Sequence, residues 1–145
     1  MVTSLHILTT SQNQGGNKLL KFTDNVVGVA KVERHLTEQD VESIMVGGIE
    51  GGIGYWAGLD NKDWEKPKDE PLSMWATKLL LEGKEVKFYD VEDDEERWSL
   101  TLEKLVKGYA LNFEKRSWDS SLENGDSDTY DAIIQFALFG SLVYG

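Results

Sequence analysis

Cysteine is missing from the sequence altogether, and histidine and proline occur only twice each. Without cysteine, the chain can form neither a disulfide framework nor a thiolate zinc site, and its composition gives no sign of an oxidising compartment. The two histidines, His6 and His35, lie outside any H-E-x-x-H pattern, which argues against a zinc hydrolase. We therefore predict a protein without a metal or a cofactor.

Recognisable catalytic motifs are also missing. The sequence contains no G-x-S-x-G, Walker or G-x-G-x-x-G motif. The segment GGIEGGIG (47–54) is rich in glycine, but it lacks the Gly-Lys-Ser/Thr that contacts phosphate and metal in a phosphate loop. We assign no catalytic residues, and we favour a protein that is not an enzyme.

Long apolar runs are absent too. The N-terminal residues MVTSLHILTTSQNQGG have neither a basic start nor an apolar run of signal-peptide length. The longest apolar stretch, AIIQFALFGSLVYG (132–145), is shorter than the roughly 20 residues that a membrane span requires. These features predict a cytoplasmic protein that does not bind or cross a membrane.

Positive charge is scarce, with 15 Lys and Arg against 26 Asp and Glu and a net charge of −11. Such a charge repels nucleic-acid phosphates and anionic lipid headgroups, so direct nucleic-acid binding is disfavoured. The charge is uneven: residues 1–36 carry four basic and two acidic side chains, a net of +2, which leaves −13 for the remainder. A small basic face near the N-terminus remains open.

The chain length and the sequence pattern predict a single α+β domain over residues 1–145, large enough for one core. The segments SLHILT, KLLKFT and VVGVAKVE within residues 1–36 read as strands, and EVKFYDVEDDEERWSLT (85–101) reads as two strands around an acidic tip. No repeated strand-helix-strand unit is visible. We therefore expect one antiparallel sheet that combines the N-terminal strands with the 86–100 hairpin.

Three or four helices should cover this sheet. The first follows Thr37, where the capping sequence TEQD precedes apolar residues at helical spacing. The second should have Ser73 as its N-cap, and the third should begin after Thr101 and end near Gly108 or shortly beyond it. The last, at about 130–139, is apolar on nearly every side, so we expect it to be buried in the core.

The stretch EGGIGYW (50–56) is the leading candidate for a functional site. Its glycines are either the C-cap of the first helix, followed by an aromatic strand on the core, or a backbone that a ligand can approach closely. Three glycines in four residues exceed what a cap needs. In the second interpretation the two rings stack on a nucleoside or another aromatic group and the carboxylate accepts its hydrogen bonds. The predicted ligand-binding residues of this stretch are Glu50, Gly51, Gly52, Tyr55 and Trp56.

The last helix supplies the other predicted ligand-binding residues, Asp131 and Gln135. Their i, i+4 spacing places them on one face of an otherwise apolar helix, where polar groups without partners are costly. They either converge with residues 50–56 on a pocket, or they are a favourable charge near the helix N-terminus and a satisfied core amide. An acid/base dyad of Glu50 and Asp131 would need the two to be close, which sequence spacing does not reveal.

The acidic tract DVEDDEER (90–97) has three interpretations: a solvated hairpin tip, a cation site, or an imitation of phosphate charge. It lacks the ligand spacing and the central glycine of an EF-hand loop, as does ENGDSDTYD (123–131). Trp64 and Trp118 lie in polar loops, where an aromatic side chain either anchors a partner or folds back over the core.

Three elements of the sequence stand together in an unusual combination. A helix runs into EGGIGYW, the junction WSLTLEKLVKG lies at 98–108, and DAIIQFALFGSLVYG closes the chain at 131–145. In this combination the sequence resembles a family of small uncharacterised proteins of bacteriophages and prophages. That family has a Glu-Gly-Gly element near a Tyr-Trp pair and a Phe-Gly ending in Tyr-Gly. The resemblance covers residues 37–145, leaves the first 36 unmatched, and brings no assigned chemistry.

The resemblance implies a phage or prophage setting. With it, we expect a non-enzymatic binding protein that acts in the host cytoplasm on a host protein or small molecule, and that counters host defence in one version of the hypothesis. The alternative is a small enzyme or nucleotide-sequestering protein with a pocket between residues 50–56 and the C-terminal helix. The oligomeric state is not predicted.

Overall fold

The computed structural model describes residues 25–145, and the chain divides into two units between His35 and Leu36. In the described part of the first unit, residues 25–35, there is neither helix nor strand beyond an isolated bridge at Lys31. The strand predicted for VVGVAKVE is therefore wrong, and its side chains stay largely exposed because no sheet covers them. The predicted strands SLHILT and KLLKFT lie outside the described residues.

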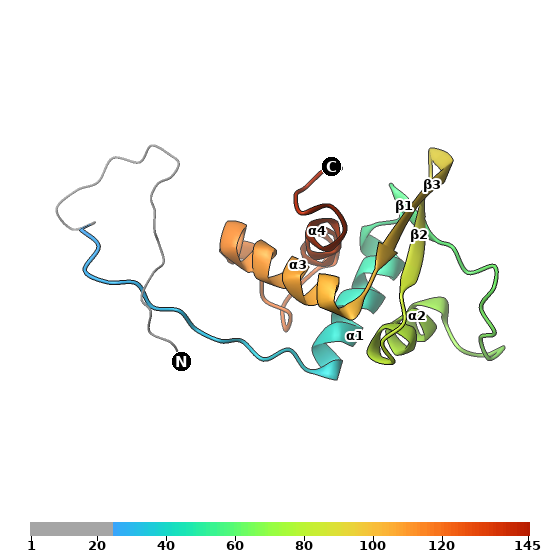
Figure 1. The fold of residues 1–145 in the computed structure, drawn as a ribbon, viewed down its shortest axis with the longest axis horizontal. Coiled ribbons are helices and arrows are strands. Elements are labelled where there is room, and N and C mark those ends of the chain that lie inside the picture. The colour runs from blue at the N-terminus through green and yellow to red at the C-terminus, as the bar shows by residue number, and fades with distance from the viewer. Residues whose placement is uncertain (1–24) are drawn as a thin grey trace. The chain divides into compact units, whose positions relative to one another are not determined.

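The second unit, Leu36–Gly145, is an α+β domain, as the sequence predicts (Figure 1). Its elements in chain order are α1 (Glu38–Gly47), the π-helical turn η3 (Gly48–Gly52), β1 (Ala57–Leu59), α2 (Leu72–Leu81), β2 (Val86–Asp90), β3 (Asp93–Leu100), α3 (Leu102–Lys115), the 3-10 turn η4 (Ser117–Asp119) and α4 (Ser127–Phe139). None of the helices in the described part of the chain is long and apolar enough to cross a bilayer.

The three strands form one antiparallel sheet in the order β1-β2-β3. The predicted 86–100 hairpin is confirmed, with Phe88 opposite Trp98 in its register. The third strand of the sheet is β1, directly after the glycine stretch, and no strand from residues 25–35 joins it. Val86 and Phe88 are fully buried while Lys87 between them is exposed, as the period of a half-buried strand requires.

The tip of the hairpin extends beyond the helices (Figure 1). Asp90 lies opposite Asp93 and Tyr89 lies opposite Arg97, so the three residues between the two β3 positions, 94–96, bulge away from β2. Residues 91–97 are all exposed. The bulge therefore leaves a run of carboxylates on the outside of the fold.

The first helix begins as predicted. Thr37 Oγ1 accepts a hydrogen bond from the Asp40 amide at 3.1 Å, and Asp40 Oδ2 accepts one from the Thr37 amide at 2.9 Å, a complete capping box. The predicted glycine C-cap at Gly51 and Gly52 is wrong, because neither residue has a positive φ angle and the helix widens instead into η3. The amide of Ile53 then donates to the carbonyl of Gly48 at 2.8 Å.

The last helix occupies the core, as predicted. In Figure 1 α4 is seen end-on beside α3, and α1, η3 and α3 all pack against it. Residues 129–137 are buried without interruption. The helix begins three residues before the predicted Tyr130, because Asp126 caps it with a hydrogen bond from the Thr129 amide at 3.1 Å.

Two further helix boundaries differ from the predictions. The helix α3 is capped by Thr101 as expected but continues past Gly108 to Lys115. The helix α2 follows Pro71 without a side-chain cap, so Ser73 is not its N-cap. Ser73 lies buried one position inside the helix, where its hydroxyl has a different partner.

Candidate functional site

The glycines of residues 47–52 allow a close approach between α1–η3 and α4. A Cβ atom at Gly48 would collide with the Ile134 side chain, and one at Gly52 would lie 2.7 Å from the carbonyl oxygen of Ser127. Gly51 is exposed, and its Cβ atom would make only an ordinary contact. The excess of glycine over a helix cap is therefore explained in large part by helix packing.

The turn after η3 brings two aromatic residues to α4. Trp56 Nε1 donates a hydrogen bond to Asp131 Oδ1 at 2.9 Å, and the hydroxyl of Tyr55 donates to Asp131 Oδ2 at 2.7 Å. One helical turn further along α4, Gln135 Nε2 also donates to Asp131 Oδ1 at 2.9 Å. Four of the seven predicted ligand-binding residues thus lie in one hydrogen-bonded group, which we call the Asp131 network: Tyr55, Trp56, Asp131 and Gln135.

Most of the Asp131 network is shielded from water. Trp56 and Gln135 are each 2% exposed, Asp131 is 8% exposed, and only Tyr55, at 54%, reaches the solvent. A buried carboxylate is tolerated where hydrogen-bond donors surround it, and Asp131 has three. Burial of the hydroxyl, its hydrogen bond to Asp131 and the negative charge there raise the pKa of Tyr55 to about 12.

Gln135 also holds the segment that follows α4. The helix α4 stops at Gly140, whose φ of 74° reverses the chain direction. Gln135 Oε1 then accepts hydrogen bonds from the amides of Val143 and Tyr144, both at 2.8 Å, and its Nε2 donates to the carbonyl of Tyr144 at 3.3 Å. We call residues 141–145, which this side chain holds, the strap.

The ring of Tyr144 lies in a slot of aromatic side chains. It stacks on Trp56 with a centroid distance of 4.8 Å and an interplanar angle of 6°, and it contacts Phe139 and Trp98 at 5.9 and 6.2 Å. Its hydroxyl donates to Asp90 Oδ2 at 3.3 Å. Burial, followed by the charge and hydrogen bond of Asp90, raises the pKa of Tyr144. The aromatic slot is thus formed by Trp56, Trp98 and Phe139, with Asp90 at one end.

The Asp131 network has little bonding capacity left for a ligand. Both amide hydrogens and both oxygen lone pairs of Gln135 are used, as is the only donor of Trp56. The ring of Tyr144 already covers a face of Trp56. In this structure, therefore, the strap occupies the surfaces of Trp56 and Gln135 that a ligand at this site would need.

Glu50 does not join the other predicted residues. It is exposed, and its Oε2 accepts a short hydrogen bond from the hydroxyl of Ser73 on α2. Asp131 bonds instead to Tyr55, Trp56 and Gln135. The arrangement thus ties Glu50 to α2 rather than to α4, and it gives no support for an acid/base dyad of Glu50 and Asp131.

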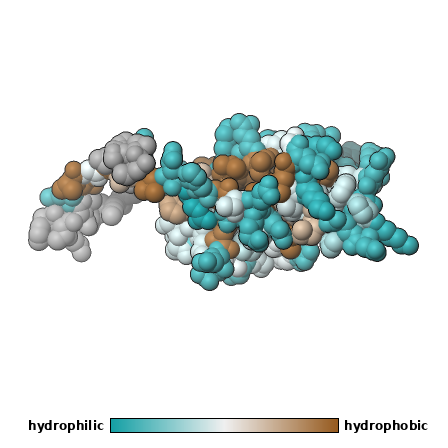
Figure 2. All heavy atoms as spheres, turned by 90° about the horizontal axis from the view of Figure 1, so that it is seen from below, coloured by the Kyte–Doolittle hydropathy of each residue, from teal (hydrophilic) through white to brown (hydrophobic). Residues whose placement is uncertain are grey.

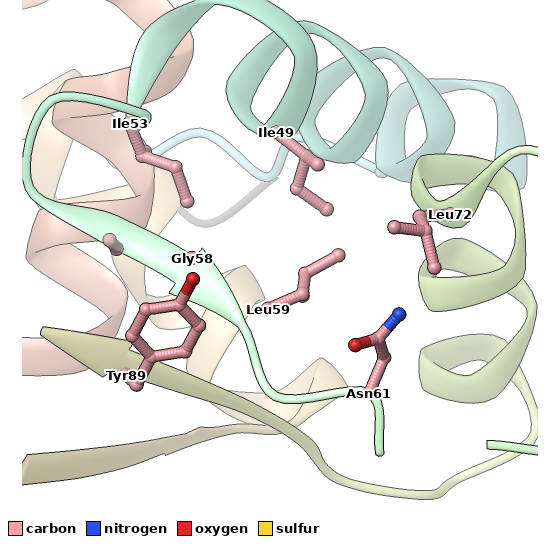
Figure 3. Close-up of a pocket in the computed structure, with 8 residues that line it drawn as sticks. Ile49, Ile53, Gly58, Leu59, Asn61, Leu72 and Tyr89 are labelled. Carbon is pink, nitrogen blue, oxygen red and sulfur yellow. The ribbon is translucent and has the colours of Figure 1, made fainter. Parts of the chain in front are cut away.

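A groove that sequence reasoning missed lies on another side of residues 49–59 (Figure 3). It has a volume of about 310 Å³ and is bordered by η3, β1 and the start of α2. The Tyr89 ring lies over Gly58, where a Cβ atom would be 2.5 Å from the Tyr89 hydroxyl oxygen. The residues that line the groove are Ile49, Ile53, Ala57, Gly58, Leu59, Asn61, Leu72 and Tyr89. The i, i+4 spacing of Ile49 and Ile53 was a signal in the sequence, but nothing in it linked them to Leu72.

The two loop tryptophans differ in their environment. Trp64 is partly buried against the core and borders a polar hollow of about 280 Å³. Trp118 is 79% exposed and lies under the guanidinium of Arg116, with 5.8 Å between the guanidinium carbon and the ring centroid. Trp64 therefore folds back over the core, whereas Trp118 does not.

A band of hydrophobic residues also lies exposed on the face of the molecule seen in Figure 2.

The acidic tip of the hairpin lies beside Arg97, but its carboxylates have no ion-pair partner in the described part of the chain. Within residues 25–145, none of the carboxylates of Glu92–Glu96 forms an ion pair, and no three acidic or histidine side chains are grouped as a metal site. The neighbouring cation, Arg97, is paired with Asp60 at 2.9 Å and lies over the Tyr89 ring. Its guanidinium also donates hydrogen bonds to the carbonyl oxygens of Asp94 and Glu96, so the arginine holds the backbone of the bulge while its ion pair is with Asp60.

Comparisons of the chain with protein-family models, with curated proteins and with solved structures gave no match. The resemblance to phage proteins therefore stays a prediction from the sequence.

Proposed function

We propose that this chain is a non-enzymatic binding protein of a phage or prophage, and that it acts in the host cytoplasm on a basic surface of a host protein. The observation that carries the proposal is the hairpin tip. Five consecutive exposed carboxylates, Glu92–Glu96, lie on a projecting turn and bulge without a cation of the described residues to pair with them. The phage setting is supported by the sequence resemblance alone.

The charge of the whole unit reinforces that of the tip. Leu36–Gly145 carries 11 basic and 24 acidic side chains, a net of −13. A concentrated negative field accelerates encounter with a positive partner and disfavours negative ones. Host enzymes that bind nucleic acid have such positive surfaces. Occupation of the nucleic-acid site of a host restriction or CRISPR enzyme is the form of counter-defence that this charge favours.

The same geometry favours binding over the small-enzyme alternative. The polar side chains that converge at α4 are bonded to one another and to the strap, so none is positioned to exchange protons with a substrate. The groove of Figure 3 is lined mainly by aliphatic residues. A nucleotide-sequestering protein would need polar groups that are free to meet the base and the phosphates.

Two five-residue variants test the proposal against host lysate. The tip variant carries Glu92→Gln, Asp93→Asn, Asp94→Asn, Glu95→Gln and Glu96→Gln. The matched control removes the same number of exposed charges elsewhere, through Glu65→Gln, Asp69→Asn, Glu103→Gln, Glu114→Gln and Glu123→Gln. Wild type and control should capture the same host protein at low salt and release it as salt is raised, whereas the tip variant should not capture it. Equal capture by all three chains would remove the tip as the binding surface.

A second measurement addresses the alternative directly. The protein is incubated with a bacterial small-molecule extract and denatured, and the extract is compared before and after. We expect neither a retained nor a converted metabolite. A metabolite released intact would indicate sequestration, and a chemically altered one would indicate an enzyme.

A further inference from the structure

The strap is held in the manner of a bound peptide. Residues 141–145 form no helix or strand, and the side chains of Leu142 and Val143 are 47% and 57% exposed. The hydrogen bonds that hold the strap come from the side chains of Gln135 and Asp90, three of them to its backbone. One aromatic side chain, Tyr144, enters the slot. Backbone hydrogen bonds with one anchoring side chain are how proteins commonly bind extended segments of their partners.

The slot recognises a ring rather than the rest of the strap. Trp56 offers a parallel face, and Trp98 and Phe139 offer tilted or edge contacts at the sides. Both arrangements are favourable geometries for aromatic pairs, and another flat side chain would find the same surfaces. Gln135 contacts only the main chain of Val143 and Tyr144, so it does not discriminate between side chains.

One part of the rim of the slot is acidic. Asp90 accepts the hydrogen bond of the Tyr144 hydroxyl, and the chain continues from Asp90 into the exposed carboxylates of the hairpin tip, Glu92–Glu96. The strap sequence SLVYG contains no basic residue. A segment with an aromatic residue and a neighbouring lysine or arginine could keep every contact of the strap and add ion pairs with this rim.

We propose that the aromatic slot is the binding site for an extended segment of a partner protein that carries an aromatic residue flanked by Lys or Arg, and that the strap occupies the slot until such a segment displaces it. The inference rests on the proposed function in one respect, namely that the partner is a protein. Gly140 is the natural hinge, because its left-handed backbone joins α4 to the strap. Displacement leaves α4 intact, since the strap begins beyond its last residue.

The experiment compares full-length wild type, Tyr144→Ala and the control Leu142→Ala. Two acetylated and amidated peptides are titrated calorimetrically: SLVYG, which copies the strap, and KLVYK, which adds positive charge. Loss of the anchoring ring should empty the slot, so Tyr144→Ala should bind KLVYK about 10-fold more tightly than wild type or Leu142→Ala does. At low salt KLVYK should bind more tightly than SLVYG, and this preference should vanish at about 0.5 M salt.

Each other result overturns the inference. A folded Tyr144→Ala chain that binds neither peptide would show that the slot is only a packing contact. Equal affinity for the two peptides at low salt would remove the basic partner. A wild-type dimer that Tyr144→Ala abolishes would identify a second copy of the chain as the occupant.

Should Tyr144→Ala fail to fold, the readout moves to wild type. Hydrogen exchange at the Val143 and Tyr144 amides should then accelerate when KLVYK is added, because the hydrogen bonds to Gln135 are released. Unchanged exchange at a saturating peptide concentration would refute the inference. If neither peptide binds but the hairpin tip is needed to capture a host protein, this inference alone is overturned. If the peptide binds but no host protein is captured through the tip, the proposed function alone is overturned.

Discussion

Asp131 and the carboxylates of the hairpin tip are chemically alike but lie in opposite surroundings. Asp131 is 8% exposed and accepts hydrogen bonds from Tyr55, Trp56 and Gln135. The side chains of Glu92–Glu96 are exposed, and within residues 25–145 the only hydrogen bond that one of them accepts comes from the Glu95 amide to Asp93 at 3.2 Å. The folded chain has thus used the hydrogen-bonding capacity of one region and left the charge of the other available to a partner.

The comparison also shows that polar side chains can converge for two different reasons, to bind a ligand or to stabilise the fold. Residues from the 53–56 turn and from α4 meet at Asp131, and the strap joins this group through Gln135, which is the convergence that a binding pocket would require. Because the groups satisfy one another, their convergence stabilises the fold and fixes the strap. Polar convergence therefore indicates a ligand site only where bonding capacity is left over.

The largest effect on stability should come from removing Asp131, the buried carboxylate. Asp131→Ala removes the acceptor of three hydrogen bonds and leaves the Trp56 donor and one of the two Gln135 amide hydrogens buried without partners. Each such donor costs free energy of its own, so the free energy of unfolding should fall by about 3 kcal/mol. Urea denaturation followed by tryptophan fluorescence measures the change.

Asp128→Ala is the matched control, because Asp128 lies on the same helix but is exposed. It should lose no more than about 0.5 kcal/mol, the contribution of a favourable charge in the first turn of a helix. A similar loss in the two variants would contradict the assignment of Asp131 as the centre of the network.

The next effect tests the close approach of the glycine stretch to α4. A Cβ atom at Gly52 would meet the backbone oxygen of Ser127 at 2.7 Å, so Gly52→Ala forces α4 to shift and should cost about 2 kcal/mol. A Cβ atom added at Gly54 would have no heavy atom of the described residues within 4 Å, its chain neighbours aside, and the φ angle of Gly54 is not positive. Gly54→Ala should therefore stabilise by about 0.5 kcal/mol, because it restricts the unfolded chain. Thermal unfolding of both variants measures these changes, and equal effects at the two positions would show that packing against α4 does not require glycine at residue 52.

These glycines show where sequence reasoning succeeded and where it stopped. The periodicity of α1 and the uniformly apolar α4 identified both helices, since burial of an apolar face imposes a local pattern. The reason for the glycines lies in α4, some 80 residues away, and no local pattern encodes such a contact. A strand after the glycines was one of the two interpretations, but its pairing with β2 was missed, because that contact too is distant in sequence.

The candidate site was predictable in part. The i, i+4 pair of Asp131 and Gln135 and the pair of Tyr55 and Trp56 identified four residues that do meet. Glu50 did not follow, because the π-helical turn directs it toward Ser73 on α2. The strap was not foreseen, since reversal at Gly140 places Tyr144 on Trp56 by a tertiary contact alone.

A smaller effect should appear at alkaline pH. The pKa of Tyr55 is raised from 10.0 to about 12, so the folded state favours the neutral phenol. The stability from this group is fully present below pH 10 and is lost as the pH rises from 10 toward 12. Tyr55→Phe should weaken the fall in stability over this window, and a weaker slope should remain because the pKa values of Tyr130 and Tyr144 are also raised. Urea midpoints across the window measure it, and an unchanged slope would contradict the hydrogen bond to Asp131.

The smallest effect on stability should come from neutralising the exposed carboxylates of the hairpin tip. Conversion of Glu92–Glu96 to amides keeps the oxygen of residue 93 that accepts the Glu95 amide and removes five like charges from a unit of net charge −13. Because exposed charges contribute little to stability and these repel one another, the free energy of unfolding should change by less than about 0.5 kcal/mol. Any gain should disappear at about 1 M salt, where screening is strong. Urea denaturation at two ionic strengths provides the measurement. A loss above about 1 kcal/mol would mean that the tip supports the fold, and its carboxylates could then no longer be assigned to a partner.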